Sequence, residues 1–346
     1  MTPKSLYLDH AATTPLLPAA RQALLDGFAG WANPSSPHAA GRAARARLED
    51  ARARLKAALD WPGEVIFTSG ASEALALAIR QTKAPLAAVS AVEHEAVLRH
   101  RGTAAVLGVD ELGRVDPADC ARSGLVAVQQ VNNETGVIQP LDQVAAAVRG
   151  AGGVLLADCA QGAGKLPLPE ADLLALSAHK FGGPIGVGAL LVRDWALLEP
   201  TGGQERGYRG GTENLPGVLA MVAALEAGAG WLEQAGRLRA QLERDVIAAG
   251  GDVISAGTPR LPTIGAYRMP GLSAAAQLIR FDGLGMAVSA GSACSSGSLR
   301  TSHVLAACGL DTRVAAEVIR VSIGRETTAE DIARFAAAWA AMAQRA

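Results

Sequence analysis

The sequence predicts an α/β protein in which helices cover a largely parallel β-sheet. Between residues 64 and 192, short apolar runs alternate with longer segments of helical periodicity. The apolar runs are continuous, as expected of strands that are buried on both faces of a sheet. After Gly250 and Gly251 the pattern changes to short strands separated by prolines, which indicates a second, smaller α+β unit.

The first unit is expected to alternate strands and helices. Helices are predicted at 71–80, from about Glu95, and at 141–149. A long helical stretch follows at 215–249, where Gly228 and Gly230 soften or interrupt the helix. The six strands are predicted at 65–68, 86–91, 125–131, 154–157, 173–177 and 189–192.

The second unit ends in a helix predicted at 329–343, which Thr328 or Thr327 caps. The N-terminal segment, to about residue 15, is expected to pack with this unit. We therefore expect a large domain at 16–250 and a small α+β domain made of 1–15 and 251–346.

The bulk composition is typical of a well-buried enzyme. The 346 residues are 49% hydrophobic and 19% charged, and the net charge is −1. Such a balance gives no strong field to attract nucleic acid or an anionic membrane. Five arginines lie in 42–54 at helical spacing among acids, which predicts a solvated helix face.

The N-terminus has no apolar segment typical of a signal peptide, and no apolar run is long enough to span a bilayer. We expect a cytoplasmic protein. Its four cysteines, at 120, 159, 294 and 308, lack the spacing of a metal site or a disulfide framework. No metal site is predicted, and free thiols are expected in a reducing compartment.

An acid and a lysine follow two neighbouring strands. Asp158 ends the strand at 154–157, and Lys180 follows the strand at 173–177. Pyridoxal 5'-phosphate (PLP) needs such a pair, because the amine forms a Schiff base and the carboxylate keeps the pyridine nitrogen protonated. In isolation, an acid and a lysine that form an ordinary surface pair would show the same pattern. The residues around them therefore decide between a surface pair and a PLP site.

Several segments around this pair favour an anion. The segment 68–73, between a strand and a helix, carries Gly and small hydroxyl residues whose N–H groups can bind phosphate. Ser177 and His179 add side-chain donors just before Lys180, and the Gly-rich loop at 207–212 carries Arg and Thr. Each motif alone is also typical of an ordinary turn.

Further polar residues follow strands at the edge where α/β sheets bind ligands. His94 can stack on a planar cofactor and move protons. Asn133 and Gln161 can hydrogen-bond a ring oxygen. We expect these residues on one rim with Asp158 and Lys180.

The ordered motifs together resemble the cysteine desulfurases of the NifS and IscS type, in the class V aminotransferase superfamily. The resemblance runs along almost the whole chain and implies PLP fold type I with a mostly parallel seven-stranded sheet. The motifs are YLDHAATTP (7–15), NPSSPH (33–38), FTSGASE (67–73), EHEAV (93–97), NNETG (132–136), DCAQ (158–161), SAHKFGGPIGVGAL (177–190), GGQERGYRGGTEN (202–214), SAGSACSSGS (289–298) and IRVSIGR (319–325).

The resemblance implies roles for individual residues. Lys180 would hold PLP and Asp158 its pyridine nitrogen. Asn133 and Arg320 would bind the substrate, Arg320 through its carboxylate. Thr212 would reach the phosphate of a neighbouring subunit, which implies a homodimer. The remaining cofactor ligands would be Gln161 and Asn133 at the ring oxygen, His94 on the ring, and Ala71, Ser72, Ser177 and His179 at the phosphate.

Cys294 lies in a Gly/Ser-rich loop of the kind that is usually exposed. By the resemblance it is the catalytic nucleophile, with His94 and Lys180 as the other catalytic residues. Its thiolate would take sulfur from L-cysteine, leaving L-alanine and a persulfide. The sulfur would pass to an iron–sulfur scaffold protein or another acceptor. Alone, a cysteine in such a loop is more often a bystander.

The chain departs modestly from the family pattern. His10 replaces the usual Asn, Cys159 stands where Ala is usual, and the segments 80–92 and 98–124 are shortened. A selenocysteine lyase or another class V aminotransferase-type enzyme is the alternative function. A third is a non-catalytic scaffold, against which the presence of Lys180 and Asp158 together with Cys294 argues.

Overall fold

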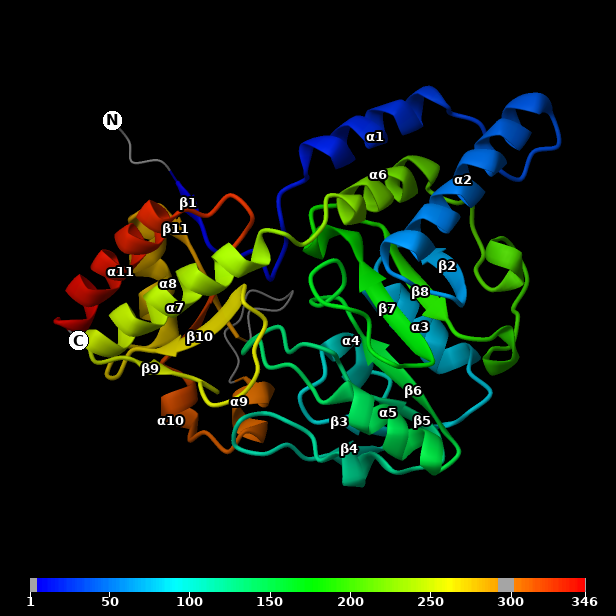
Figure 1. The fold of residues 1–346 in the computed structure, drawn as a ribbon. Helices are drawn as coiled ribbons and strands as arrows, with labels where there is room; N and C mark the ends of the chain where they lie inside the picture. The colour runs from blue at the N-terminus through cyan, green and yellow to red at the C-terminus, as the bar shows by residue number, and fades with distance from the viewer. Residues whose placement is uncertain (1–4, 292–301, 346) are drawn as a thin grey trace.

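The computed structural model describes residues 5–291 and 302–345, which form two β-rich parts lying side by side (Figure 1). The larger part is built on a seven-stranded sheet and the smaller on a four-stranded sheet, with a further two-stranded pairing. The predicted α/β class is confirmed.

The seven-stranded sheet has the order β2-β8-β7-β6-β5-β3-β4. Strand β8 runs antiparallel to both of its neighbours, and the remaining adjacent pairs are parallel. The carboxyl ends of β3, β5, β6 and β7 therefore meet at one edge. The strands are β2 (Glu64–Thr68), β3 (Leu86–Ser90), β4 (Ala105–Leu107), β5 (Gly124–Ala127), β6 (Gly153–Asp158), β7 (Leu173–Ser177) and β8 (Gly188–Val192).

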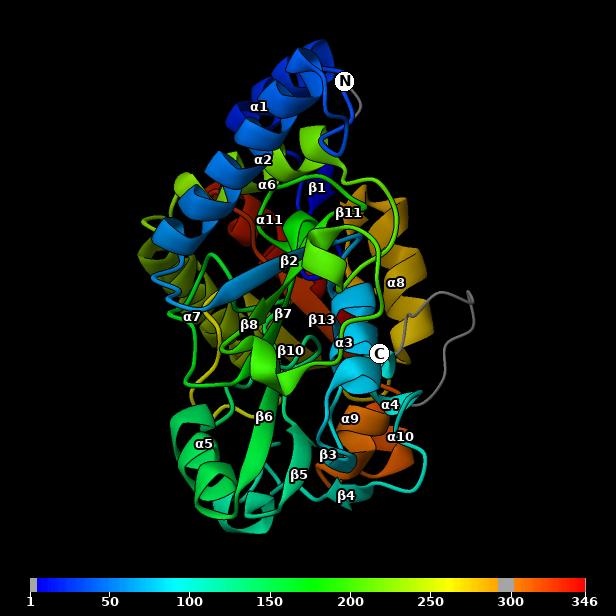
Figure 2. The ribbon, with the colours of Figure 1, turned by 90° about the vertical axis from the view of Figure 1, so that its right-hand side faces the viewer.

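Helices cover both faces of this sheet, as Figure 2 shows from the side. On β7, Leu174 and Leu176 join one hydrophobic core, while Leu173 and Ala175 join the other. Helices α3 (Ala71–Gln81) and α4 (Glu95–Leu98) pack on the second core. The first core is covered by α1 (Pro18–Ala29), α2 (Ala39–Ala58), α5 (Leu141–Gly150) and α6 (Leu215–Glu226). Burial on both faces explains the continuous apolar strands.

The smaller part has an antiparallel sheet of order β12-β13-β10-β9. Strand β1 (Leu6–Tyr7) pairs in parallel with β11 (Met286–Ala287), so the N-terminal segment lies here. The strands are β9 (Asp252–Val253), β10 (Ile264–Arg268), β12 (Ser289–Ala290) and β13 (Val318–Ser322). The helices are α7 (Leu232–Ala248), α8 (Ala274–Gly283), α9 (His303–Ala307), α10 (Thr312–Ala315) and α11 (Ala329–Ala343).

The predicted elements agree with the structure apart from details of length. The long helical stretch is interrupted between α6 and α7, where Gly228 has φ +69°. The strand predicted at 125–131 is shorter, because β5 ends at Ala127. Thr328 caps α11 through a capping box with Asp331. The described residues also form four short 3₁₀ helices: η1 (Pro117–Cys120), η2 (Ala178–Lys180), η3 (Trp195–Leu197) and η4 (Glu205–Gly207).

Helix α7 packs into the hydrophobic core of the smaller part, through Leu238, Leu242 and Val246. The two cores thus divide between α6 and α7. The domain boundary that the sequence suggests near residue 250 stays a prediction. No helix in the described ranges is both long and apolar enough to cross a membrane.

The prediction that 42–54 forms a solvated helix face is wrong for Arg52, which is only 4% exposed. The Arg52 guanidinium donates from both terminal nitrogens to the Glu205 carboxylate, at 2.9 Å each. Glu205 also accepts the Phe67 N–H at 2.8 Å. A buried ion pair thus fixes the Gly-rich loop around η4 to α2 and β2.

Replacing Glu205 by Ala would leave the Arg52 charge buried without its partner. We expect a loss of about 3–5 kcal/mol in the free energy of unfolding, measured by urea denaturation. Glu226→Ala is the matched control, because Glu226 pairs with Arg54 at the surface, where both side chains are exposed. The control should lose less than about 1 kcal/mol. Equal losses would contradict this role of Glu205.

Candidate functional site

A cavity of about 590 Å³ opens at the carboxyl edge of the large sheet, where the smaller part faces it. It brings together residues that are up to 309 positions apart in the sequence, from Ala11 to Arg320. Ten of the twelve predicted site residues line it: Ala71, Ser72, His94, Asn133, Asp158, Gln161, Ser177, His179, Lys180 and Arg320.

Asp158 and Lys180 lie at the ends of the adjacent parallel strands β6 and β7. The Lys180 ε-amine donates to the carbonyl oxygens of Ala11 at 2.7 Å and Ala12 at 2.9 Å. Asp158 accepts the Ala160 N–H at 2.9 Å. Burial raises the pKa of Asp158, against the opposing effects of that hydrogen bond and of nearby His94 and Lys180. The carboxylate is therefore best stabilised by a cationic N–H partner in the cavity.

The imidazole of His94 is held by the first turn of α4. Its Nδ1 accepts the Ala96 N–H at 3.1 Å, so the neutral ring carries its proton on Nε2. Burial lowers the pKa of His94, although Asp158 opposes this effect. His94 is thus a neutral ring beside the acid, able to accept or pass on a proton.

The N-terminus of α3 forms an anion cradle on the cavity wall. The Cα of Gly70, which precedes the helix with φ +150°, lies 2.6 Å from where a Cβ on Gly188 would stand. A side chain on either residue would disturb this turn. No side chain of a described residue caps α3, so the N–H groups of residues 71–73 are available to an anion.

Side chains complete this cradle. Ser72, Ser177 and His179 line the same cavity. Burial and the positive charges of Lys180 and Lys165 lower the pKa of His179 to about 4, so the ring is neutral near pH 7. It can donate one hydrogen bond without adding charge. This set of donors at a helix N-terminus fits a phosphate group.

Arg320 reaches the cavity from β13 of the smaller part. Its guanidinium donates to Asp9 at 2.7 Å and to the backbone carbonyl of Asn133 at 2.9 Å. Only 6% of Arg320 is exposed, so both contacts fix the direction of its planar fork. The sequence did not assign Asp9 this part, although Asp9 lies in the motif at 7–15.

The two amides, Asn133 and Gln161, line the same cavity as Arg320 and Lys180. Gln161 donates from Nε2 to the Ala11 carbonyl at 2.8 Å, which leaves its buried Oε1 without a partner among the described residues. The side chain of Asn133 makes no hydrogen bond to another described residue. Both can therefore bind a ligand.

Two predicted residues are not placed in the cavity. Thr212 lies on an exposed loop between η4 and α6 and does not line it. The loop is tied to the cradle by the ion pair of Arg209 with Glu73 at 3.0 Å. Cys294 lies outside the described residues. On the described side of that gap, Gly291 lines the cavity.

The three described cysteines are buried thiols. Burial raises the pKa of Cys120 and of Cys308 to about 11, and raises that of Cys159 well above its usual value. The nucleophilic thiolate is disfavoured at all three positions.

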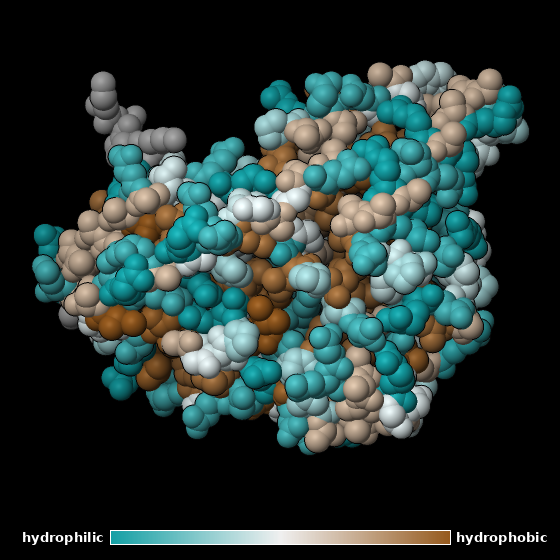
Figure 3. Space-filling model, in the orientation of Figure 1, coloured by the Kyte–Doolittle hydropathy of each residue, from teal (hydrophilic) through white to brown (hydrophobic). Residues whose placement is uncertain are grey.

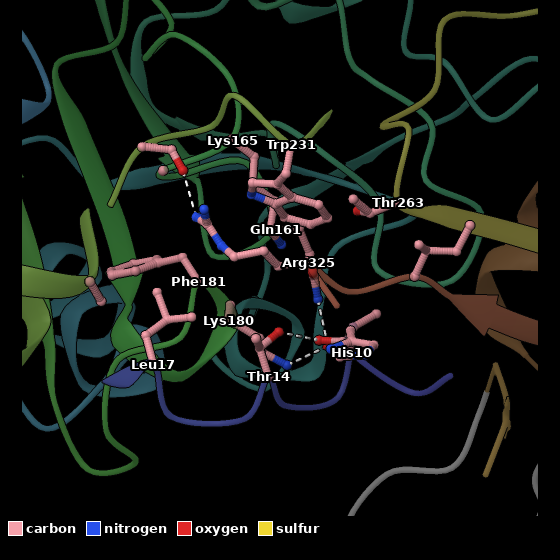
Figure 4. A pocket seen from close by; sticks show the side chains of 15 residues that line it. His10, Thr14, Leu17, Gln161, Lys165, Lys180, Phe181, Trp231, Thr263 and Arg325 are labelled. Carbon is pink, nitrogen blue, oxygen red and sulfur yellow. Dashed lines mark hydrogen bonds between the residues drawn. The ribbon is translucent and has the colours of Figure 1, made fainter. Parts of the chain in front are cut away.

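A small, partly open space lies beside Lys180, with His10, Lys165 and Arg325 in its wall (Figure 4). Lys165 was not predicted as a site residue from the sequence. The sequence feature that could have indicated it is the scarcity of lysine, with five lysines against 27 arginines. The ring of His10 is packed so closely on Gly324 that a Cβ there would lie 2.0 Å from it. Burial, with a contribution from Lys165, lowers the pKa of His10 to about 4.

Comparisons with known proteins agree with this geometry. The model of the family described as Aminotransferase class-V matches residues 6–335. A cysteine desulfurase from Cereibacter sphaeroides is 38% identical, over 95% of this chain and 93% of its own. Cysteine desulfurase IscS from Dictyoglomus turgidum is 35% identical, over 95% and 92%. The crystal structure of a NifS-like protein from Rickettsia africae superposes with a TM-score of 0.89 at 28% identity, over 99% and 100%.

His10 should make the fold sensitive to acid. Unfolded histidine binds a proton near pH 6.5 but folded His10 only near about 4, so stability falls as the pH drops through this window. His10→Asn should remove roughly 2 kcal/mol of that loss, seen as a smaller fall in Tm between about pH 6.5 and 4.5. His38→Asn, at an exposed helix cap, should not. An unchanged acid sensitivity in His10→Asn would refute the assignment.

Proposed function

The chain belongs to the class V aminotransferase family, and we propose that it is a cysteine desulfurase that takes sulfur from L-cysteine and leaves L-alanine. The observation that carries the proposal is the convergence of Lys180, Asp158, the α3 N-terminus and Arg320 on one cavity. Similarity to cysteine desulfurases along nearly the whole chain supports the choice of reaction.

The cofactor we propose is pyridoxal 5'-phosphate, which the family implies. The residues present fit it. The unused N–H groups of α3, with Ser72, Ser177 and His179, would hold its phosphate, and Asp158 its pyridine nitrogen. Lys180 would attach it, His94 would lie on its ring, and Asn133 and Gln161 would face its oxygen. When bound, this cofactor withdraws electrons from the amino-acid Cα and so makes its proton acidic.

The protein's own groups would then do the following. Arg320 binds the substrate carboxylate through its fork and so fixes the amino acid against the cavity wall. Lys180 removes the proton from Cα, and His94 relays protons at the cavity. The thiolate of Cys294 attacks the substrate sulfur: an S–S bond forms, the Cβ–S bond breaks, and its electron pair stays with the carbon. Protonation of that carbon gives alanine, and Cys294 keeps the sulfur as a persulfide.

The choice of Cys294 as the nucleophile rests on family resemblance and on the state of the other cysteines. Burial keeps Cys120, Cys159 and Cys308 as thiols, which makes them poor nucleophiles. The flanking residue Gly291 belongs to the cavity wall, which supports a cysteine three positions later acting there.

We also propose that the enzyme works in the cytoplasm as a homodimer and gives its sulfur to an iron–sulfur scaffold protein or another acceptor. The exposed Thr212 would reach a partner subunit's phosphate site. On and next to α1, Leu25, Phe28 and Trp31 are 55%, 63% and 83% exposed, which favours a covering partner. Elsewhere, the face in Figure 3 is largely hydrophilic, with hydrophobic side chains gathered near its middle.

Cys294→Ser tests the reaction. The variant should keep the visible absorption of the bound cofactor and lose at least about 100-fold in sulfide and alanine release from L-cysteine, because serine cannot accept sulfur. Cys308→Ala is the control and should stay active.

The outcomes separate the alternatives. Full sulfide release by Cys294→Ser would overturn the mechanism. Cleavage of L-selenocysteine in preference to L-cysteine would indicate a selenocysteine lyase, since that reaction can proceed without the cysteine. A wild-type protein that binds no cofactor would indicate a scaffold.

Arg320→Lys tests substrate binding. Lysine keeps the charge but loses the planar fork, so KM for L-cysteine should rise by about 10-fold or more. The cofactor absorption should not change. A fall in kcat with an unchanged KM would contradict a role in binding the carboxylate.

A further inference from the structure

Lys165 and Lys180 both line the small, partly open space beside the main cavity (Figure 4). The space has room of about 20 Å³, enough for about one water molecule. Lys165 also lines an open groove on the surface beside Trp61 and Pro167. Lys165 therefore connects this space with the groove at the surface.

The backbone fixes Lys165 in this position. Residues 162–166 form a turn in which the N–H groups of Lys165 and Leu166 both donate to the Gly162 carbonyl, at 2.9 and 2.8 Å. Gly164 has φ +71°, and a Cβ there would lie 3.3 Å from Cβ of Phe181, the residue after Lys180. The turn thus packs directly on the segment that carries Lys180.

Inside the space basic groups face Lys165, and its lining residues include no carboxylate. The open groove that Lys165 also lines includes Asp60, Glu170 and Arg193. His10 faces it from the N-terminal segment, Arg325 from the segment after β13, and Lys180 from η2. Outside the space, the positive charge of Lys165 also contributes to lowering the pKa of His179. Arg325 is held away by its bonds to the Ala227 and Gly228 carbonyls and by stacking on Trp231.

The amine of Lys165 forms no hydrogen bond or ion pair with any described residue. Burial, followed by the positive charge of Lys180, lowers the pKa of Lys165 to about 7. Asp158 lines the main cavity but not this space, and it does not contribute to the shift in the pKa of Lys165. Lys180 is thus the charged group that contributes to the lowered pKa of Lys165, in addition to burial.

The residue type fits this dependence. Of the 32 lysines and arginines in the chain, only five are lysines, and two of these five line this space. Arginine could fill a similar volume, but its guanidinium does not lose a proton in proteins. An amine at position 165, unlike a guanidinium, can therefore gain and lose a proton.

We infer that Lys165 is a positioning residue that shares one positive charge with Lys180. When Lys180 is neutral, the Lys165 amine holds a proton; when Lys180 takes a proton from the substrate Cα, Lys165 releases one to water in the open groove. The number of charges behind the cavity then stays constant. The inference rests on the proposed function for the proton transfer at Lys180, while the coupling of the amines can be tested without it.

The first test measures the pKa of Lys165 by competitive acetylation and mass spectrometry on the full-length, cofactor-free protein. The exposed Lys83 is the internal reference. Lys165 should titrate near neutral pH in the wild type and at least about one pH unit higher in Lys180→Met. The same pKa in both proteins, with both shown to be folded by thermal melting, would overturn the inference.

The second test needs the cofactor-loaded enzyme and no variant at Lys180. The absorption of the bound cofactor is titrated with pH in wild type, Lys165→Met and Lys165→Arg. Lys165→Arg carries a permanent charge at this position and Lys165→Met carries none. Relative to the wild type, the midpoint of the absorption titration should therefore shift in opposite directions in the two variants, each by about half a pH unit or more. The pH profile of kcat/KM should shift in the same direction as this midpoint in each variant.

Shifts in the same direction, or none, would mean that Lys165 only packs the turn, and would overturn the inference. If the wild type binds no cofactor, the proposed function fails, and the acetylation result then decides on charge sharing alone.

Discussion

The backbone of residues 9–14 connects the two sheets, and the cavity depends on it. The Ala11 N–H donates to Ser322 of the smaller sheet, and its carbonyl accepts both Gln161 and Lys180 of the larger one. Asp9 at one end of the segment directs Arg320, while the Thr14 N–H at the other donates to the His179 carbonyl. This strip of chain therefore sets the distance between the substrate-facing arginine and the lysine.

Much of the fold follows from local chemistry. Strands that are buried on both faces are apolar throughout, so the strands of the large sheet could be predicted from the sequence. The predicted carboxyl ends of these strands indicated that Asp158, His94 and Lys180 lie at one edge of the sheet. The interruption between α6 and α7 was foreseen from glycine. The burial of the α2 face that carries Arg52 was not predicted. Its partner Glu205 is 153 residues away, and helical spacing does not show which other segment packs on a helix face.

The same limit separates the site residues that were anticipated from those that were not. Ten follow strands or lie in motifs, so their position along the chain was sufficient. The pairing of Asp9 with Arg320 joins residues 311 apart, and the position of Lys165 depends on a turn packed against Phe181. Thr212 presupposes a second chain. Such relations are tertiary, and no local pattern encodes them.

The preference for guanidinium over amine has a chemical consequence at the surface. Aldehydes condense with unprotonated amines and hardly at all with the permanently charged guanidinium. The positive charge of this protein is carried mostly by arginine, and beyond the two lysines behind the cavity the sequence offers an aldehyde only Lys4, Lys56, Lys83 and the α-amino group. An aldehyde reagent therefore meets six amines in all, two of them at the cavity, so each modified amine can be assigned individually.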